Sequence, residues 1–190
     1  MLAYKLSKIL TLVLILSTAW LAAACSPAAP PQTAEAAVPH LDALVSAASS
    51  GSSEEVLDLI QFSSLPCTTV EGMGGPPKCQ AGEAEGTLVE ALPVLGPEGH
   101  HMRREDFSSW TGIDGAQLYA AFRTPESIFS DEFYPAGEYG VAFRLPDGAN
   151  VVVFQVTQEG IVRLDYHLPP TIDELLEQSD VIVGPPAPFY

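Results

Sequence analysis

Residues 139–167, YGVAFRLPDGANVVVFQVTQEGIVRLDYH, carry the strongest secondary-structure signal in the chain. In the first and last parts of this stretch apolar residues alternate with small or polar ones, and residues 150–157 form an almost continuous apolar run. Pro146-Asp147-Gly148 and Gln158-Glu159-Gly160 separate the three parts with residues that favour turns. The pattern predicts a three-stranded antiparallel meander with one apolar face.

The sequence that follows this stretch predicts one short helix and a tail. Pro169 and Pro170 end the last strand, and residues 171–174 (TIDE) have the spacing of a capping box that opens a helix through Gln178. The chain from Asp180 onward is either a last edge strand or a loose end, and we assign residues 181–190 to a Pro-rich tail.

A strand and a further helix are expected before the meander. Residues 87–95 (TLVEALPVL) are typical of a strand, and Pro93 should place that strand at a sheet edge because proline cannot donate to the ladder. In residues 113–122 apolar side chains recur at helical spacing, which predicts a short helix with Asp114 as its cap.

Two short helices are expected at the start of the domain. Apolar residues recur at helical spacing from Leu41 to Ala48, and Gly51 interrupts this pattern. Ser52 and Glu55 then form a capping box for a second helix with one apolar face. The two segments predict a helical hairpin.

This order of elements indicates an α+β fold, in which the helical hairpin and further short helices pack on one face of a curved antiparallel sheet. The order from residue 41 to residue 167 resembles that of the NTF2-like (cystatin-like) cone, although no motif is shared. The resemblance implies a cone-shaped sheet, in which enzymes of that family use polar residues inside the cone for acid–base chemistry. The segment between Cys67 and Cys79 is not part of the family pattern.

The N-terminal segment has the three parts of a secretory signal: Lys5 and Lys8, an apolar run from residue 9, and a small-residue end before Cys25. Leu21-Ala22-Ala23-Ala24-Cys25 resembles the lipobox of bacterial lipoproteins, with Ala22 where that family usually has Leu. The resemblance implies that diacylglycerol is attached to Cys25 and that the chain is cut before it. An uncleaved membrane anchor and a plain signal peptide cut near residue 24 are the alternatives.

We therefore expect residues 1–24 to be a lipoprotein signal peptide, residues 25–39 a Pro/Ala-rich tether and residues 40–180 a single α+β domain. The protein would be exported and held by Cys25 on the cell membrane or outer membrane, facing the periplasm or the exterior. Ser26 in place of Asp favours the outer membrane under the sorting rule of that family, if the cell has two membranes.

The expected mature chain is strongly acidic. Of the eight Lys and Arg residues Lys5 and Lys8 lie in the signal, which holds none of the 24 acidic residues, so 6 basic and 24 acidic residues remain and the formal net charge is −18. Such a surface repels phosphates, which argues against nucleic acid as a partner. The expected partners are the lipid bilayer, through Cys25, and either a small apolar ligand or a neighbouring envelope protein.

Cys67 and Cys79 are expected to form a disulfide. An odd number of cysteines would normally leave a free thiol in an exported protein, and acylation of Cys25 would leave these two as a pair in an oxidising compartment. The segment between them is rich in turn-forming residues and has no hydrophobic periodicity. Metal binding is the alternative for two cysteines, but neither the spacing nor a nearby histidine favours it.

Two polar groups could in principle carry chemistry. His100 and His101 have acidic neighbours at Glu98, Glu105 and Asp106, but adjacent side chains on a strand point to opposite sides, so we expect a solvated loop and no metal site.

Arg163, Asp165 and His167 alternate along one strand and should share a face, where the carboxylate could orient the imidazole as a general base. Val162, Leu164 and Tyr166 occupy the other face, so the simpler interpretation is that the polar face lies outside. We predict no catalytic residue and no cofactor, since no established catalytic or nucleotide-binding motif occurs.

Three hypotheses about function remain open at this point. The first is a non-enzymatic, membrane-anchored binding module. The second is a small NTF2-like enzyme that uses Asp165 and His167, and the third is a structural envelope lipoprotein without a ligand. A pocket of a few hundred Å³ would favour the first over the third.

Overall fold

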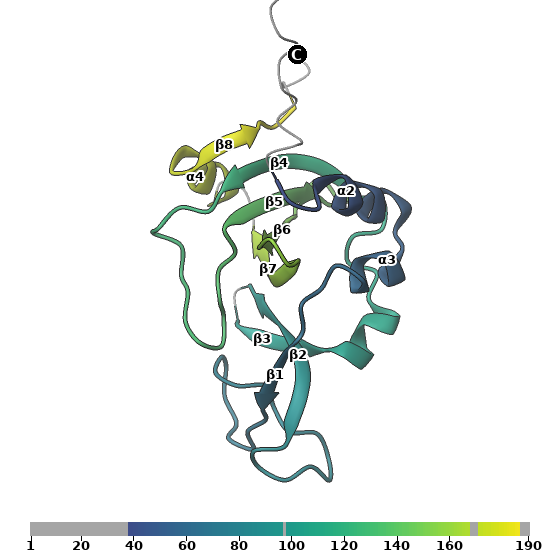
Figure 1. Ribbon diagram of the computed structural model, residues 1–190, viewed down its shortest axis with the longest axis vertical. Coiled ribbons are helices and arrows are strands. Elements are labelled where there is room, and N and C mark those ends of the chain that lie inside the picture. Colours follow the sequence, from purple (N-terminus) through teal and green to yellow (C-terminus); the bar gives the residue numbers. More distant parts are fainter. Residues whose placement is uncertain (1–37, 97, 168–170, 187–190) are drawn as a thin grey trace, which may run out of the picture. The chain divides into compact units, whose positions relative to one another are not determined.

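The computed structural model describes residues 38–96, 98–167 and 171–186. The predicted signal peptide, the lipidation site at Cys25 and most of the tether lie outside these residues. The described chain forms a large mixed sheet with a few short helices, which confirms the α+β prediction (Figure 1).

The sheet has eight strands within the described residues. Its path runs in the order β1-β2-β7-β6-β5-β4-β8, and β3 pairs with β2 off this path. The strands are β1 (Ser63–Pro66), β2 (Leu88–Leu95), β3 (His100–Arg103), β4 (Gln117–Arg123), β5 (Tyr139–Arg144), β6 (Val151–Val156), β7 (Ile161–His167) and β8 (Asp180–Val183).

One pairing makes the sheet mixed rather than antiparallel as predicted. The end of β2 runs parallel to β7, with Val94 opposite Leu164 and Leu95 opposite Asp165. A long connection separates these two strands in sequence, so no hairpin forces them to be antiparallel. The pairings of β5 with β6 and of β6 with β7 are antiparallel along their whole length.

Helix α2 (Leu41–Ser50) ends as the sequence predicts, and helix α3 begins as predicted. Gly51 adopts a left-handed conformation with φ 64° and donates its N–H to the carbonyl of Ala47, which is how helices commonly terminate at glycine. The Ser52 side chain accepts a hydrogen bond from the Glu55 N–H, so the expected N-cap of α3 (Ser53–Leu57) is present.

Helices cover both faces of the sheet, not one face as expected. Helices α2 and α3 and the 3-10 helix η2 (Arg104–Ser109) contribute to the larger core cluster, together with Phe143 and Phe154 of the strands. Helix α4 (Thr171–Glu177) places Ile172 and Leu176 in a second cluster on the opposite face. The sheet is therefore buried on both sides over much of its area, and the pocket described below borders the α4 side.

The predicted helix at residues 113–122 is wrong. Most of this segment is strand β4, which pairs with β5 on one side and β8 on the other. Residues 119–122 are all buried, because Ala121 faces the larger core cluster while Ala120 and Phe122 face the α4 side. A strand that is apolar on both faces has no alternation, so its pattern can resemble that of a helix.

The edge position predicted from Pro93 is also wrong, because β2 has partners on both sides. Residues 88–91 of β2 pair with β1, Val94 and Leu95 pair with β7, and residues 91–94 pair with β3. Pro93 pairs only with His101 and lies between the parts of β2 that contact β1 and β7. This gap provides locally the unpaired side that proline requires.

The C-terminal segment includes an edge strand. Strand β8 pairs with β4 at the end of the sheet path, which favours the edge strand over the loose end for the segment from Asp180. None of the helices in the described residues is both long and apolar enough to cross a bilayer.

Gly140 provides a test of the packing on the α4 side of the sheet. A Cβ atom at Gly140 would lie 2.2 Å from the ring of Phe122, which is fully buried on the neighbouring strand β4. We expect Gly140→Ala to lower the free energy of unfolding by about 1–3 kcal/mol in urea titrations, as overpacking does. Gly184→Ala is the control, because a Cβ atom there meets nothing within 4 Å. Equal stability of the two variants would contradict this packing.

Candidate functional site

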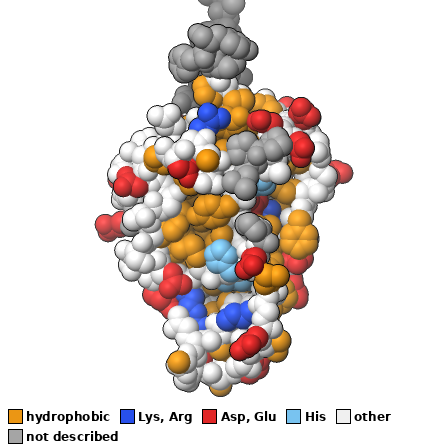
Figure 2. Space-filling view, turned by 180° about the vertical axis from the view of Figure 1, so that it is seen from behind, with side chains coloured by type: hydrophobic (Ala, Val, Ile, Leu, Met, Phe, Trp, Pro, Cys, Tyr) orange, Lys and Arg blue, Asp and Glu red, His pale blue; other side chains and the backbone are white. Residues whose placement is uncertain are grey.

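A pocket of about 660 Å³ lies beside the end of β7, between α4 and the loop that connects β4 to β5. Its volume is within the range of small-molecule sites, roughly 300–1,000 Å³. In the space-filling view, hydrophobic side chains gather in the middle of one face of the molecule (Figure 2). The pocket is lined by Leu95, Gly96, Ile128, Phe129, Asn150, Arg163, Asp165, Tyr166, His167, Thr171 and Leu175.

A buried ion pair forms the base of this pocket. Arg163 is 0% exposed and Asp165 is 3% exposed. The guanidinium donates two hydrogen bonds to the carboxylate, from Nε to Oδ1 at 2.6 Å and from Nη2 to Oδ2 at 2.9 Å. Gln155 of β6 donates a third hydrogen bond to Oδ2 at 2.9 Å. Both carboxylate oxygens are therefore engaged by neighbouring side chains.

The prediction that this polar face lies outside is wrong, because the β4–β5 loop covers it. Arg163 Nη1 donates to the carbonyl oxygens of Phe129 and Tyr134, at 2.8 and 2.7 Å. The side-chain oxygen of Gln155 accepts from the Thr124 hydroxyl and the Gly137 N–H, both at 3.2 Å. We call residues 124–137 the cover loop. These bonds fix its two ends and its middle, and the loop in turn supplies Ile128 and Phe129 to the pocket wall.

His167 lies on the same face of β7, at the pocket, with its side chain half-buried. Its Nε2 atom is buried and has no hydrogen-bond partner among the described residues. Burial lowers the pKa of His167 below its ordinary value, and the nearby Asp165 carboxylate opposes this only in part. The side chain is consequently a neutral imidazole near neutral pH, and its Nε2 lacks a hydrogen-bond partner among the described residues.

The arrangement does not resemble an Asp–His pair for general-base catalysis. Such a pair needs the carboxylate to hold the imidazole in one orientation, usually through a direct hydrogen bond. The Asp165 oxygens are instead used by Arg163 and Gln155. The structure thus places the three predicted residues together but gives Arg163 and Asp165 a structural task, and leaves only His167 with a free polar atom.

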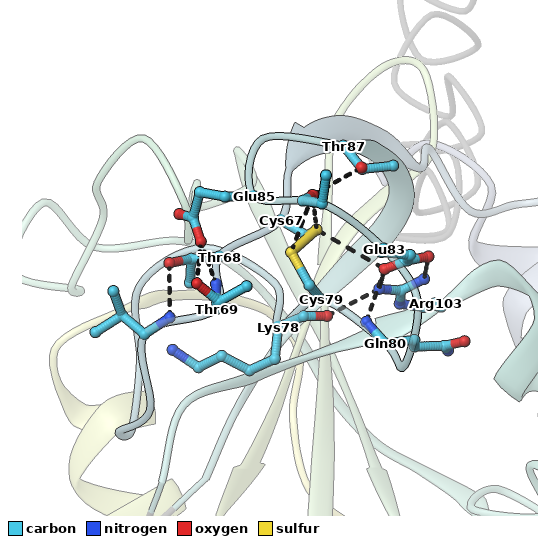
Figure 3. Close-up of a disulfide and its surroundings, with 12 residues drawn as sticks. Cys67, Thr68, Thr69, Lys78, Cys79, Gln80, Glu83, Glu85, Thr87 and Arg103 are labelled. Carbon is cyan, nitrogen blue, oxygen red and sulfur yellow. Dashed lines mark hydrogen bonds and ion pairs between the residues drawn. A yellow bond between two sulfur atoms is a disulfide. The ribbon is translucent and has the colours of Figure 1, made fainter.

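The predicted disulfide between Cys67 and Cys79 is confirmed, with an S–S distance of 2.00 Å (Figure 3). An ion pair lies beside it. Arg103 of β3 donates two hydrogen bonds to Glu83, at 2.7 and 2.6 Å, and one to the Lys78 carbonyl at 2.8 Å. The hydrogen bonds that Glu83 accepts from Arg103, followed by that from the Gln80 N–H, lower the pKa of Glu83 to about 2. The disulfide loop is therefore attached to the sheet through Arg103.

The two adjacent histidines have different surroundings. His101 is partly buried, donates from Nε2 to the carbonyl of Phe133 at 3.1 Å and packs against the Tyr134 ring, whereas His100 is exposed. The Asp106 carboxylate accepts the backbone N–H of Arg103. The expectation of no metal site here stays a prediction.

The two cysteines are bonded to each other and are not free to bind a metal. Cys67 and Cys79 lie with Glu83 in a group that has ligand-like spacing, but the two sulfur atoms are bonded to each other and are not free thiolates.

Comparison of the whole chain with protein families, with curated proteins and with solved structures gives no match. The function is therefore argued from the geometry of the pocket.

The buried pair at the base of the pocket can be tested by removing one partner or both. We expect Arg163→Met to cost about 3–5 kcal/mol of unfolding free energy, because it leaves the Asp165 carboxylate buried without its counter-charge. The double variant Arg163→Met/Asp165→Leu should recover a large part of that loss in the same urea titrations. A double variant no more stable than the single one would argue against a buried pair.

Arg123→Met is the matched control for this experiment. Arg123 pairs with Asp180 at 3.8 Å, and both side chains are largely exposed. Such a surface pair contributes about 0–1 kcal/mol, so this variant should unfold almost like the unaltered protein.

Proposed function

We propose that this protein is an exported, lipid-anchored binding module without catalytic activity, which takes a small, largely apolar ligand in the pocket beside β7. The observation that carries the proposal is the pocket itself, with a volume of about 660 Å³ and walls supplied mainly by apolar residues. Ligand sites commonly combine such walls with a few convergent polar groups. His167 supplies such a polar group here, beside the Arg163–Asp165 pair, whose hydrogen bonds are made within the protein.

The same pocket favours a binding module over a structural lipoprotein without a ligand. Hydrogen bonds to Arg163 and Gln155 hold the cover loop over the polar face, so one wall of the pocket is fixed by buried contacts. A site with a pre-formed wall loses less entropy when a ligand binds.

Catalysis by Asp165 and His167 is the weaker candidate. Both carboxylate oxygens already accept hydrogen bonds from Arg163 or Gln155, so the carboxylate does not hold the imidazole in one orientation. The geometry therefore supports recognition by His167 more than proton transfer through the pair.

The proposal also includes two structural features that the sequence predicts, the helical hairpin and the three-stranded meander. In it, the helical hairpin at residues 41–57 and the three-stranded meander at residues 139–167 form a curved, rigid support for the pocket. The successive antiparallel pairings of β5, β6 and β7 favour this arrangement. The resemblance to the NTF2-like cone stays a prediction from element order, and one of its elements, the helix at residues 113–122, is a strand.

The anchor is proposed from the sequence. The lipobox-like end of the signal places Cys25 at the start of the mature chain, and several acyl chains on one residue give stable membrane attachment. The net negative charge of the domain would keep it away from anionic headgroups. The proposed location is the cell membrane or outer membrane, with the domain facing the periplasm or the exterior.

Cys25→Ala tests the anchor directly. In the native host, the unaltered protein should fractionate with membranes, and its intact mass should equal that of residues 25–190 plus acyl groups. The variant should lose the acyl mass entirely, because it lacks the only sulfur that the lipobox presents. Cys79→Ser is the control and should keep the acyl mass. An unacylated mature chain in the unaltered protein would refute the anchor without bearing on the pocket.

Leu175→Trp tests the pocket as a binding site. Leu175 lines the pocket from α4, and a larger ring at this position would occupy part of it. With the full-length protein in lipid nanodiscs and empty nanodiscs as a blank, we expect the variant to bind naphthalene about tenfold more weakly, a loss of roughly 1.4 kcal/mol. Leu88→Trp is the matched control, because Leu88 is 67% exposed and does not line the pocket. Unchanged binding by Leu175→Trp, or no binding at all, would contradict the proposal.

A further inference from the structure

We infer that the pocket selects an uncharged ligand with a hydroxyl group on an apolar body, and that this hydroxyl hydrogen-bonds to Nε2 of His167. The inference rests on the proposed function, since it assumes that the pocket holds a ligand. It goes further by naming the chemical class of the ligand and the atom that recognises it.

The charges around the pocket argue for an uncharged ligand. Among the described residues that line it, only Arg163 and Asp165 are formally charged, and they neutralise each other through two hydrogen bonds. The remaining hydrogen bonds of the guanidinium go to carbonyl oxygens of the cover loop. A carboxylate or an ammonium group would therefore lose its hydration on entry without meeting a free opposite charge, which is costly.

The nitrogen of His167 argues for one polar group on that ligand. Nε2 is buried, has no partner among the described residues and belongs to a side chain that lines the pocket. A buried polar atom left unsatisfied costs free energy that a ligand could recover by supplying the missing hydrogen bond. An entirely apolar ligand would leave this cost in place.

The chemistry of imidazole favours a neutral polar group that can both donate and accept, and a hydroxyl is the smallest such group. In a neutral imidazole one ring nitrogen is a donor and the other an acceptor, so Nε2 can have either role. A hydroxyl can donate and accept, and it satisfies both tautomers, whereas an ether or a ketone satisfies only one. Burial favours the neutral form of His167, and only the neutral form has these two tautomers.

The apolar body of the ligand would contact the cover loop and α4. Ile128 and Phe129 line the pocket from the cover loop, and Leu175 lines it from α4. The Phe129 ring is 56% exposed, so a bound apolar group would remove part of it from water. Burial of such surface is the principal source of affinity for an uncharged ligand.

Four probes with the same ring system test the inference: naphthalene, naphthol, naphthoate and naphthylmethylammonium. Each is titrated by fluorescence into the full-length protein in zwitterionic nanodiscs near neutral pH, with empty nanodiscs as a blank. Naphthol should bind about three- to tenfold more tightly than naphthalene, the gain that one neutral hydrogen bond provides. Naphthoate and naphthylmethylammonium should bind at least about tenfold more weakly than naphthol.

Variants of His167 test whether the preference for naphthol over naphthalene depends on this side chain. His167→Leu should still bind naphthalene but should lose the preference for naphthol, and His167→Gln should restore part of it because its amide both donates and accepts. His100→Leu is the matched control, because His100 is exposed and lies outside this pocket. Circular dichroism of each variant verifies that it is folded. The result with the unaltered protein decides the question if His167→Leu fails to fold.

The outcomes separate this inference from the proposed function. If none of the four probes binds, the binding module and the inference both fail. If naphthalene and naphthol bind equally well, the pocket stands and the role of His167 is refuted. If naphthoate or naphthylmethylammonium binds most tightly, the pocket stands and the uncharged ligand is refuted.

Discussion

The burial of one guanidinium group constrains this whole side of the molecule. Arg163 has no exposed surface, and a charge in that position is tolerated only when it is paired and hydrogen-bonded. Asp165 supplies the counter-charge, and the cover loop supplies two carbonyl oxygens that accept from Nη1. Strand β7 thus determines where residues 124–137 must lie, although these residues are far from it in sequence.

That constraint also shapes the pocket. The hydrogen bonds from Arg163 bring Phe129 over the end of the sheet, where it faces α4 across the space beside His167. The charges of Arg163 and Asp165 cancel, so the pocket that they border has no net formal charge, and its walls are mainly apolar. Arg163 and Asp165, which together with His167 were the candidates for catalysis, instead hold the cover loop in place as one wall of the pocket. His167 remains as the polar contact.

The sequence predicts features that depend on local pattern, and it misses burial that is caused by segments far away in the chain. Strands β5 and β7 follow from alternation, β6 from a continuous apolar run, the start of α3 from its capping box and the disulfide from cysteine pairing. Strand β4 was predicted as a helix because burial on both faces removes its alternation. Arg163 and Asp165 were expected outside, since nothing in β7 itself indicates that residues 124–137 fold over them.

Proton exchange at the Arg163 side chain tests the central claim most directly. By nuclear magnetic resonance, the Nε–H of Arg163 should give a resolved signal that exchanges slowly with water, because it is buried and donates to Asp165. The exposed side chains of Arg123 and Arg144 provide fast-exchanging references in the same sample. An Arg163 signal that exchanges as fast as theirs would contradict the buried pair, and with it the wall of the pocket.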